Sequence, residues 1–207
     1  MKKRTASVER KTKETQIRVR LDLDGAGKSS VSTGIGFLDH MLELFSKHGL
    51  FDLQLKAKGD LHIDLHHTNE DIGIALGEAF RQALGEKRGI HRMGSSFVPM
   101  DETLARVRVV ADFSGRPHFR LDWAAPGRKP AEFRRSGRIP YGLEDGKHFL
   151  ESFSAKSGLT LHIDVLKAGG DGHHLLESVF KALGRALREA VETDPRVKGV
   201  PSTKGKL

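Results

Sequence analysis

The amino-acid sequence predicts an α+β fold built from two similar halves, in which antiparallel sheets are covered by helices. The windows HMLELFSKHGL, from His40, and HFLESFSAKSGL, from His148, carry histidine, leucine, glutamate, phenylalanine and serine in the same order. A double histidine with a glutamate follows each window, beginning at His66 and at His173. Matches in this order indicate an internal duplication, so the two halves are expected to share one fold.

Strand-like runs open each half. These runs are TQIRVRLDLDG and SSVSTGI in the first half, and LARVRVVADFSG and HFRLDW in the second. Arg18 and Arg20 alternate with apolar residues, as expected of a strand with one solvated face. A helix then spans about Gly36 to Lys47, because apolar residues recur there at helical spacing.

A further strand and a further helix complete each half. The alternating runs FDLQLKAKGDLHIDL and TLHIDVLKAGG predict strands that carry His62 and His162 on their surface. The segments GEAFRQALGEKRG and ESVFKALGRALREAV predict the closing helices. We assign residues 1–95 to the first repeat and residues 96–207 to the second. The two chain ends and the basic segment 126–140 are expected to be the most mobile parts.

Composition narrows the functional classes. The chain has 207 residues, no cysteine and a formal net charge of +8. Without cysteine, disulfides and thiolate chemistry are excluded. The basic N-terminus has no apolar run behind it, so we expect no signal peptide, no membrane span and a cytoplasmic location. The basic excess predicts an anionic partner, and a small phosphorylated molecule is favoured over nucleic acid because no nucleic-acid-reading motif occurs.

The double-histidine motif has the spacing of a metal site. Helical residues four apart lie on one face, so His66 and Glu70 can converge on one ion while His67 points about 100° away. With the second motif and the two upstream histidines, the candidate ligands are His40, His66, His67, Glu70, His148, His173, His174 and Glu177. These suffice for two ions, each with three imidazoles and one carboxylate and with open coordination positions. Such sulfur-free sites suit Mn, Fe, Co or Zn, and six-coordination favours manganese.

The chain closely resembles the imidazoleglycerol-phosphate dehydratase family of histidine biosynthesis. The matching stretches, which together span nearly the whole chain, are GFLDHML, DLHHTNEDIGIALGEAF, GIHRMGSSFVPMDETLA, DFSGRP, SGLTLHI, GHHLLESVFKALGRAL and PSTKG. The resemblance implies a duplicated α+β fold of the ribosomal protein S5 domain 2 type. It also implies a homo-oligomer of 24 subunits with manganese sites at subunit contacts and two Mn²⁺ per active site. Asn69 departs from the family pattern, in which an apolar residue is expected.

The resemblance also implies roles for individual residues. The eight candidate ligands match the family's metal ligands. The matching substrate-binding residues are Glu14, His48, Arg92, Arg116, Lys181, Ser202, Thr203 and Lys204, of which the two arginines and the three residues of the C-terminal tail would hold a phosphate. The family reaction removes water from D-erythro-imidazole glycerol phosphate to give imidazole acetol phosphate, by way of an imidazolate held by two manganese ions. Glu14 matches the catalytic proton shuttle.

Two other functions fit parts of the pattern. A dinuclear metallohydrolase acting on a phosphate ester would also use histidines, carboxylates and arginines, but it usually needs a carboxylate that bridges two close metals. A basic RNA-binding module of the ribosomal S5 type would leave the histidines incidental, and its RNA affinity would depend on salt.

Overall fold

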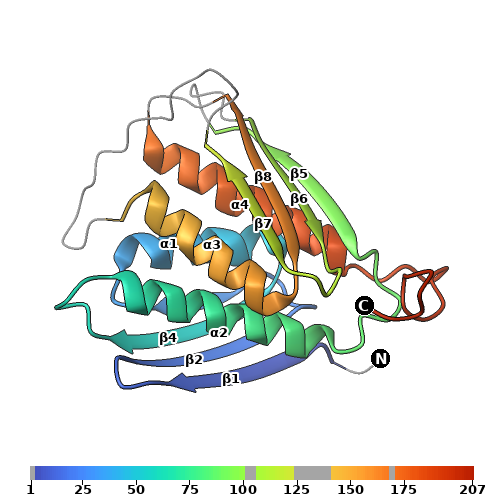
Figure 1. Ribbon diagram of the computed structural model, residues 1–207, viewed down its shortest axis with the longest axis horizontal. Helices are drawn as coiled ribbons and strands as arrows, with labels where there is room; N and C mark the ends of the chain where they lie inside the picture. Colours follow the sequence, from blue (N-terminus) through green and yellow to red (C-terminus); the bar gives the residue numbers. More distant parts are fainter. Residues whose placement is uncertain (1–2, 101–105, 124–140, 168–170) are drawn as a thin grey trace.

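The computed structural model describes residues 3–100, 106–123, 141–167 and 171–207 (Figure 1). The basic segment 126–140 lies outside the described residues. The first half contains β1 (Thr5–Lys11), β2 (Thr15–Asp22), β3 (Ser29–Ser32), α1 (Gly36–Gly49), β4 (Asp52–Gly59) and α2 (His66–Leu84). The second contains β5 (Met93–Val98), β6 (Arg106–Asp112), β7 (His118–Asp122), α3 (Leu143–Ser157), β8 (Thr160–Lys167) and α4 (Gly172–Val191).

The two halves have the same topology, which confirms the predicted α+β fold and its duplication. The strand orders are β1-β2-β4-β3 and β5-β6-β8-β7. Each sheet is mixed rather than purely antiparallel, because β3 pairs with β4, and β7 with β8, in parallel. A helix joins each parallel pair, as a crossover connection requires. Since β5 begins at Met93, the proposed division between residues 95 and 96 lies inside this strand.

Two strands were not expected from the sequence, and one expected strand is shorter. The N-terminal segment, expected to be mobile, forms edge strand β1, whose residues are exposed or half-buried. In β5, a Cβ on Gly94 would lie 2.1 Å from the carbonyl oxygen of Ala186, so glycine allows α4 to pack closely there. The run after Phe51 stops at Gly59, which leaves His62 exposed in a turn rather than on a strand. His162 lies on the exposed face of β8, as predicted.

The helices lie between the two sheets and pair across the repeats. Figure 1 shows α2 against the β1–β2–β4 side and α4 against β5 and β6, while α2 packs on α3 and α1 on α4. Buried phenylalanines from both halves meet at the centre, where the Phe80 and Phe153 ring centroids are 5.3 Å apart. The repeats therefore share one hydrophobic core, and the helix pairing brings residues of one repeat against residues of the other.

Glycines set the spacing of both helix pairs. A Cβ on Gly77 of α2 would lie 2.6 Å from the carbonyl oxygen of Phe153 in α3. A Cβ on Gly184 of α4 would lie 2.6 Å from the carbonyl oxygen of Phe45 in α1. Each glycine follows the glutamate of its own histidine motif by the same number of residues. The duplication has therefore preserved the close backbone approach that brings the histidine-bearing helices together.

Candidate metal centres and anion pocket

The double histidines stand at the starts of α2 and α4. Asp64 accepts a hydrogen bond from the His66 backbone N–H at 2.8 Å, and Asp171 accepts one from His173 at 2.8 Å. These aspartates satisfy backbone donors that the first helical turn leaves free. Both helices therefore begin at the motif, which places each first histidine on the same face as the glutamate four residues later.

The first cluster, called the α1/α4 cluster, contains His40, His173 and Glu177. Oε1 of Glu177 accepts hydrogen bonds from Nε2 of His40 at 2.7 Å and from Nε2 of His173 at 3.2 Å. The other oxygen, Oε2, accepts one from Nζ of Lys181 at 2.7 Å. Burial alone would raise the pKa of Glu177, but the hydrogen bonds from Lys181 and His40 outweigh it and lower the pKa to about 2. Glu177 is therefore ionised at neutral pH and able to bind a cation.

The second cluster, called the α2/α3 cluster, contains His66, Glu70 and His148. Its three ligand atoms lie within 4.8 Å of one another, as do those of the first cluster. The rings of His66 and His148 are stacked with centroids 4.3 Å apart. Each cluster thus joins a histidine and glutamate from one repeat to a histidine from the other.

The second histidine of each motif points away from both clusters. Nδ1 of His67 lies 2.9 Å from an oxygen of Asp60 and 3.9 Å from an oxygen of Glu14. The hydrogen bond with Asp60, reinforced by the negative charge of Glu14, raises the pKa of His67. Nδ1 of His174 is buried and has no hydrogen-bond partner within the described ranges.

The residues present fit a divalent metal. Two imidazole nitrogens and one carboxylate oxygen converge in each cluster, a donor set that suits Mn²⁺, Fe²⁺, Co²⁺ or Zn²⁺. The sequence predicted three imidazoles and one carboxylate per ion. One chain brings two imidazoles and one carboxylate to each cluster, because His67 and His174 are directed elsewhere.

The predicted phosphate-binding residues line a single pocket of about 770 Å³ at the end of α4. Its polar lining includes Arg92, Arg116, Ser202, Thr203 and Lys204, and also Lys206, which the sequence interpretation missed. Its position two residues after Lys204, in the same basic tail, could have indicated Lys206. This concentration of positive charge suits an anion such as phosphate.

The two arginines of this pocket differ in whether the guanidinium group is already bonded to other residues of the chain. The Arg92 guanidinium donates to both carboxylate oxygens of Asp112, at 2.7 and 3.0 Å, and to the carbonyl oxygen of Pro201 at 2.9 Å. It therefore ties the C-terminal tail to the second sheet. The Arg116 side chain is exposed and has no ion pair or hydrogen bond with any residue that the structure describes.

Two more predicted substrate-binding residues lie near the α1/α4 cluster instead of this pocket. Lys181 is bonded to Glu177 as described above. His48, in the last turn of α1, is half-buried, and burial, together with the positive charges of Lys181 and Arg185, lowers its pKa. Asn69, expected to be apolar in the family pattern, is buried, donates to the carbonyl oxygen of Asp145 at 2.8 Å and accepts from the Tyr141 hydroxyl at 3.0 Å. The amide nitrogen and the amide oxygen of Asn69 therefore each have a hydrogen-bond partner.

The pocket and the α1/α4 cluster lie toward opposite ends of α4. The Arg92 backbone N–H donates to the carbonyl oxygen of Ala190 at 2.8 Å, which places Arg92 beside the last turn of the helix. Glu177 lies in the second turn, and a helical rise of about 1.5 Å per residue separates it from Ala190 by about 20 Å. In Figure 1 the C-terminal tail accordingly extends beyond the far end of α4.

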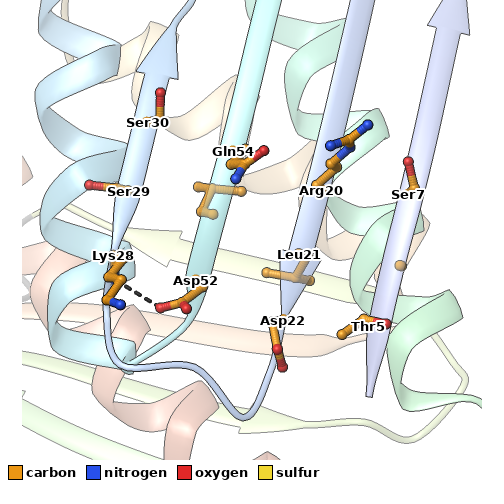
Figure 2. A pocket seen from close by; sticks show the side chains of 12 residues that line it. Thr5, Ser7, Arg20, Leu21, Asp22, Lys28, Ser29, Ser30, Asp52 and Gln54 are labelled. Atoms are coloured by element: carbon orange, nitrogen blue, oxygen red, sulfur yellow. Dashed lines mark hydrogen bonds between the residues drawn. The ribbon is translucent and has the colours of Figure 1, made fainter. Parts of the chain in front are cut away.

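A second cavity, of about 530 Å³, lies on the outer face of the first sheet (Figure 2). Ser7, Arg20 and Gln54 line it, and its rim includes Asp52, which accepts a hydrogen bond from the Lys28 backbone N–H at 2.9 Å. It contains none of the predicted site residues. Among the described residues, no helix has the length and hydropathy needed to cross a membrane.

The chain is similar over nearly its whole length to proteins of one enzyme family. The sequence profile described as "Imidazoleglycerol-phosphate dehydratase" matches residues 33–187. Proteins of that name from Methylococcus capsulatus and Methylorubrum extorquens are 53% and 51% identical to this chain, covering 100% and 99% of it and 100% of each relative. The crystal structure of the Staphylococcus aureus imidazoleglycerol-phosphate dehydratase has a TM-score of 0.74 and 34% identity, and the match covers 92% of this chain and 99% of that one. A Pyrococcus furiosus structure, titled as a complex of IGPD with (S)-C348, has a TM-score of 0.75 and 33% identity, over 97% and 100% of the two chains.

These similarities extend over the histidine motifs of both repeats and do not favour the hydrolase or the RNA-binding alternative. The chain belongs to the imidazoleglycerol-phosphate dehydratase family and is a dehydratase of histidine biosynthesis.

Proposed function

We propose that this chain dehydrates D-erythro-imidazole glycerol phosphate to imidazole acetol phosphate with two Mn²⁺ ions per active site. The observation that carries the proposal is the pair of duplicated clusters, each with two imidazoles and a carboxylate within 4.8 Å. When bound, the ions would stabilise the substrate imidazole in its deprotonated form, from which the neighbouring hydroxyl can leave. His40, His173 and Glu177 would hold one ion, and His66, Glu70 and His148 the other.

We further propose that the active site is assembled between copies of the chain, in a homo-oligomer of 24 subunits. The phosphate pocket is about 20 Å from the α1/α4 cluster along α4, which is too far for one small substrate to reach both within one chain. His67 and His174 would complete metal sites of neighbouring copies, because neither contributes a ligand atom to the α1/α4 or the α2/α3 cluster of its own chain. Two features of the single chain therefore support shared sites, and the family resemblance supplies the number of subunits.

The remaining site residues would bind the substrate and move protons. Arg116, Lys204 and the hydroxyls of Ser202 and Thr203 would anchor the phosphate, so that binding energy far from the reacting carbon orients the substrate. Glu14 is an exposed carboxylate near His67 and would carry the proton to and from the reacting carbon. Arg92, which Asp112 holds in place, would contribute to the same phosphate site.

Elemental analysis combined with turnover of imidazole glycerol phosphate tests this proposal. We expect about two Mn per chain after reconstitution, and dehydration that is lost on chelation and restored by Mn²⁺. Protein that remains free of metal after reconstitution, or turnover that is insensitive to chelation, would contradict the proposed use of metal.

A further inference from the structure

We infer that Asp60 is a positioning residue that orients His67 as a metal ligand. The inference rests on the proposed function, in which His67 binds a metal ion. Asp60 follows directly after β4, and its Oδ2 lies 2.9 Å from Nδ1 of His67. The Asp60 side chain is 16% exposed, and its second oxygen, Oδ1, is buried with no hydrogen-bond partner in the described part of the chain.

The contact decides which imidazole nitrogen can bind a metal. A neutral imidazole has one N–H donor and one free lone pair, and its hydrogen-bond partner determines which nitrogen carries the proton. Because Asp60 accepts at Nδ1, the proton stays there and the lone pair remains on Nε2. The same hydrogen bond fixes the rotation of the ring. A carboxylate bonded to the distal nitrogen also makes a ligating imidazole more basic.

The geometry favours Asp60 as a positioning residue for His67 over Asp60 as a ligand of a third metal site. Glu14, Asp60 and His67 do offer three ligand atoms within 4.8 Å. However, Asp60 is already engaged with the His67 nitrogen at hydrogen-bonding distance, whereas Glu14 lies 3.9 Å from it and is half exposed. Asp60 therefore has the geometry of a supporting group, and Nε2 of His67 is left for an ion.

No equivalent carboxylate is paired with the second histidine in the described part of the second repeat. Alignment of the two double histidines places Lys167 at the position of Asp60, and Nδ1 of His174 is buried without a partner in the described residues. Removal of the Asp60 carboxylate should therefore affect one of the two ions, the one that takes His67. The ion that takes His174 should be unaffected.

Manganese titration of the metal-free, full-length protein tests the inference by isothermal titration calorimetry. We expect wild-type protein to bind two Mn²⁺ per chain, and Asp60→Ala to weaken one of them by about 10- to 100-fold while the other is unchanged. The affinity of Asp60→Asn for that ion should lie between those of wild type and Asp60→Ala, because the asparagine amide oxygen can still accept a hydrogen bond from Nδ1. The control is Asp122→Ala, which removes an exposed aspartate at a strand end and should titrate as wild type.

Any other result of the manganese titration would overturn the positioning role of Asp60. Two unchanged affinities in Asp60→Ala would overturn the positioning role while leaving the proposed function intact. Equal weakening of both ions, or a lower melting temperature of the metal-free variant, would assign Asp60 a general structural role. Three ions in wild type, with one absent from the variant, would make Asp60 a ligand instead. Wild-type protein that binds no Mn²⁺ would overturn the proposed function, and the inference with it.

Discussion

The α1/α4 and α2/α3 clusters hold the same ligand types at equivalent positions, but their surroundings differ. The side chain of Glu177 is 10% exposed and shares its oxygens among His40, His173 and Lys181. Glu70 is half-buried and has no ion pair or hydrogen bond among the described residues. Ile74 occupies the position that Lys181 has in the second repeat. Duplication has therefore preserved the geometry of the ligands, while divergence has changed what each carboxylate contacts.

This difference indicates that two ions bound here would have unequal roles. Lys181 places a positive charge beside one cluster, and the other cluster has Ile74 in its place. A substrate oxygen with developing negative charge would be better stabilised beside the α1/α4 cluster. The following variants test where the repeats are equivalent and where they are not.

The largest expected effect is in Glu14→Gln, which removes a carboxylate that lies beside His67 of the first repeat. We expect kcat to fall by about 10²- to 10⁴-fold, the usual contribution of a general acid–base group. Manganese content and substrate affinity should be retained, because glutamine keeps the shape of the side chain. Steady-state kinetics measure the effect, with Lys13→Gln, a change at an exposed neighbouring residue, as the control that should keep a normal kcat. A normal kcat would remove Glu14 from the mechanism.

The two motif glutamates should each control a different ion. Glu70→Gln and Glu177→Gln should each reduce manganese content from two per chain toward one, and each should lower turnover by about 10³-fold if one ion contributes several kcal/mol. Elemental analysis and turnover of both variants give the comparison. Retention of both ions in either variant would contradict the assignment of that glutamate as a ligand.

The Lys181 ammonium should contribute to substrate binding. Lys181→Met should raise KM by about 10-fold or more, the usual effect of losing a hydrogen bond to a charged group. Arg188→Met, on the last turn of the same helix, is the control and should leave KM near its wild-type value. If KM is unchanged and manganese affinity falls, Lys181 supports Glu177 rather than the substrate.

The glycines of the helix pairs should show that the two repeats are equivalent in packing. Gly77→Ala and Gly184→Ala each place a methyl group 2.6 Å from a carbonyl oxygen of the partner helix. We expect each to lower the free energy of unfolding by about 1–3 kcal/mol, as overpacking does. Urea unfolding of the two variants measures this. If the free energy of unfolding is unchanged in only one of the two variants, that helix pair can move apart without loss of stability.

The smallest expected effect concerns the ends of α1 and α3. Leu50 and Gly158 occupy equivalent left-handed positions, with φ of 55° and 69°. A Cβ on Gly158 would meet only ordinary contacts, so Gly158→Ala should cost about 1 kcal/mol from backbone conformation alone. Thermal unfolding would detect this loss. An unchanged melting temperature would show that the second repeat tolerates a side chain here as the first already does with leucine.

Most of the secondary structure could be predicted because it depends on local patterns. Alternation in the run around Arg18 predicted the solvated face of β2, and helical spacing predicted α1. β1 and β5 could not be predicted in this way, because the first has no fully buried residue and the second contains glycine and two serines. Their strand structure comes from pairing with β2 and β6.

The same tetrapeptide shows how tertiary contacts override local sequence. LHID occurs from Leu61 and again from Leu161, and both stretches alternate apolar and polar residues. The first forms a turn before α2, whereas the second lies in β8, paired with β6 and β7. A Cβ on Gly59 would lie 1.9 Å from Oγ1 of Thr68, so the last residue of β4 packs directly against the first turn of α2.

The sequence by itself determined the types of ligand, their duplication and the helical face that each motif presents, because i and i+4 spacing is a local property. Only the tertiary structure decided that His40 meets Glu177 and His148 meets His66, since these contacts depend on helices of one repeat packing against helices of the other. It also decided that His67 pairs with Asp60. No spacing rule predicts that contact, because the chain reverses direction between the two residues.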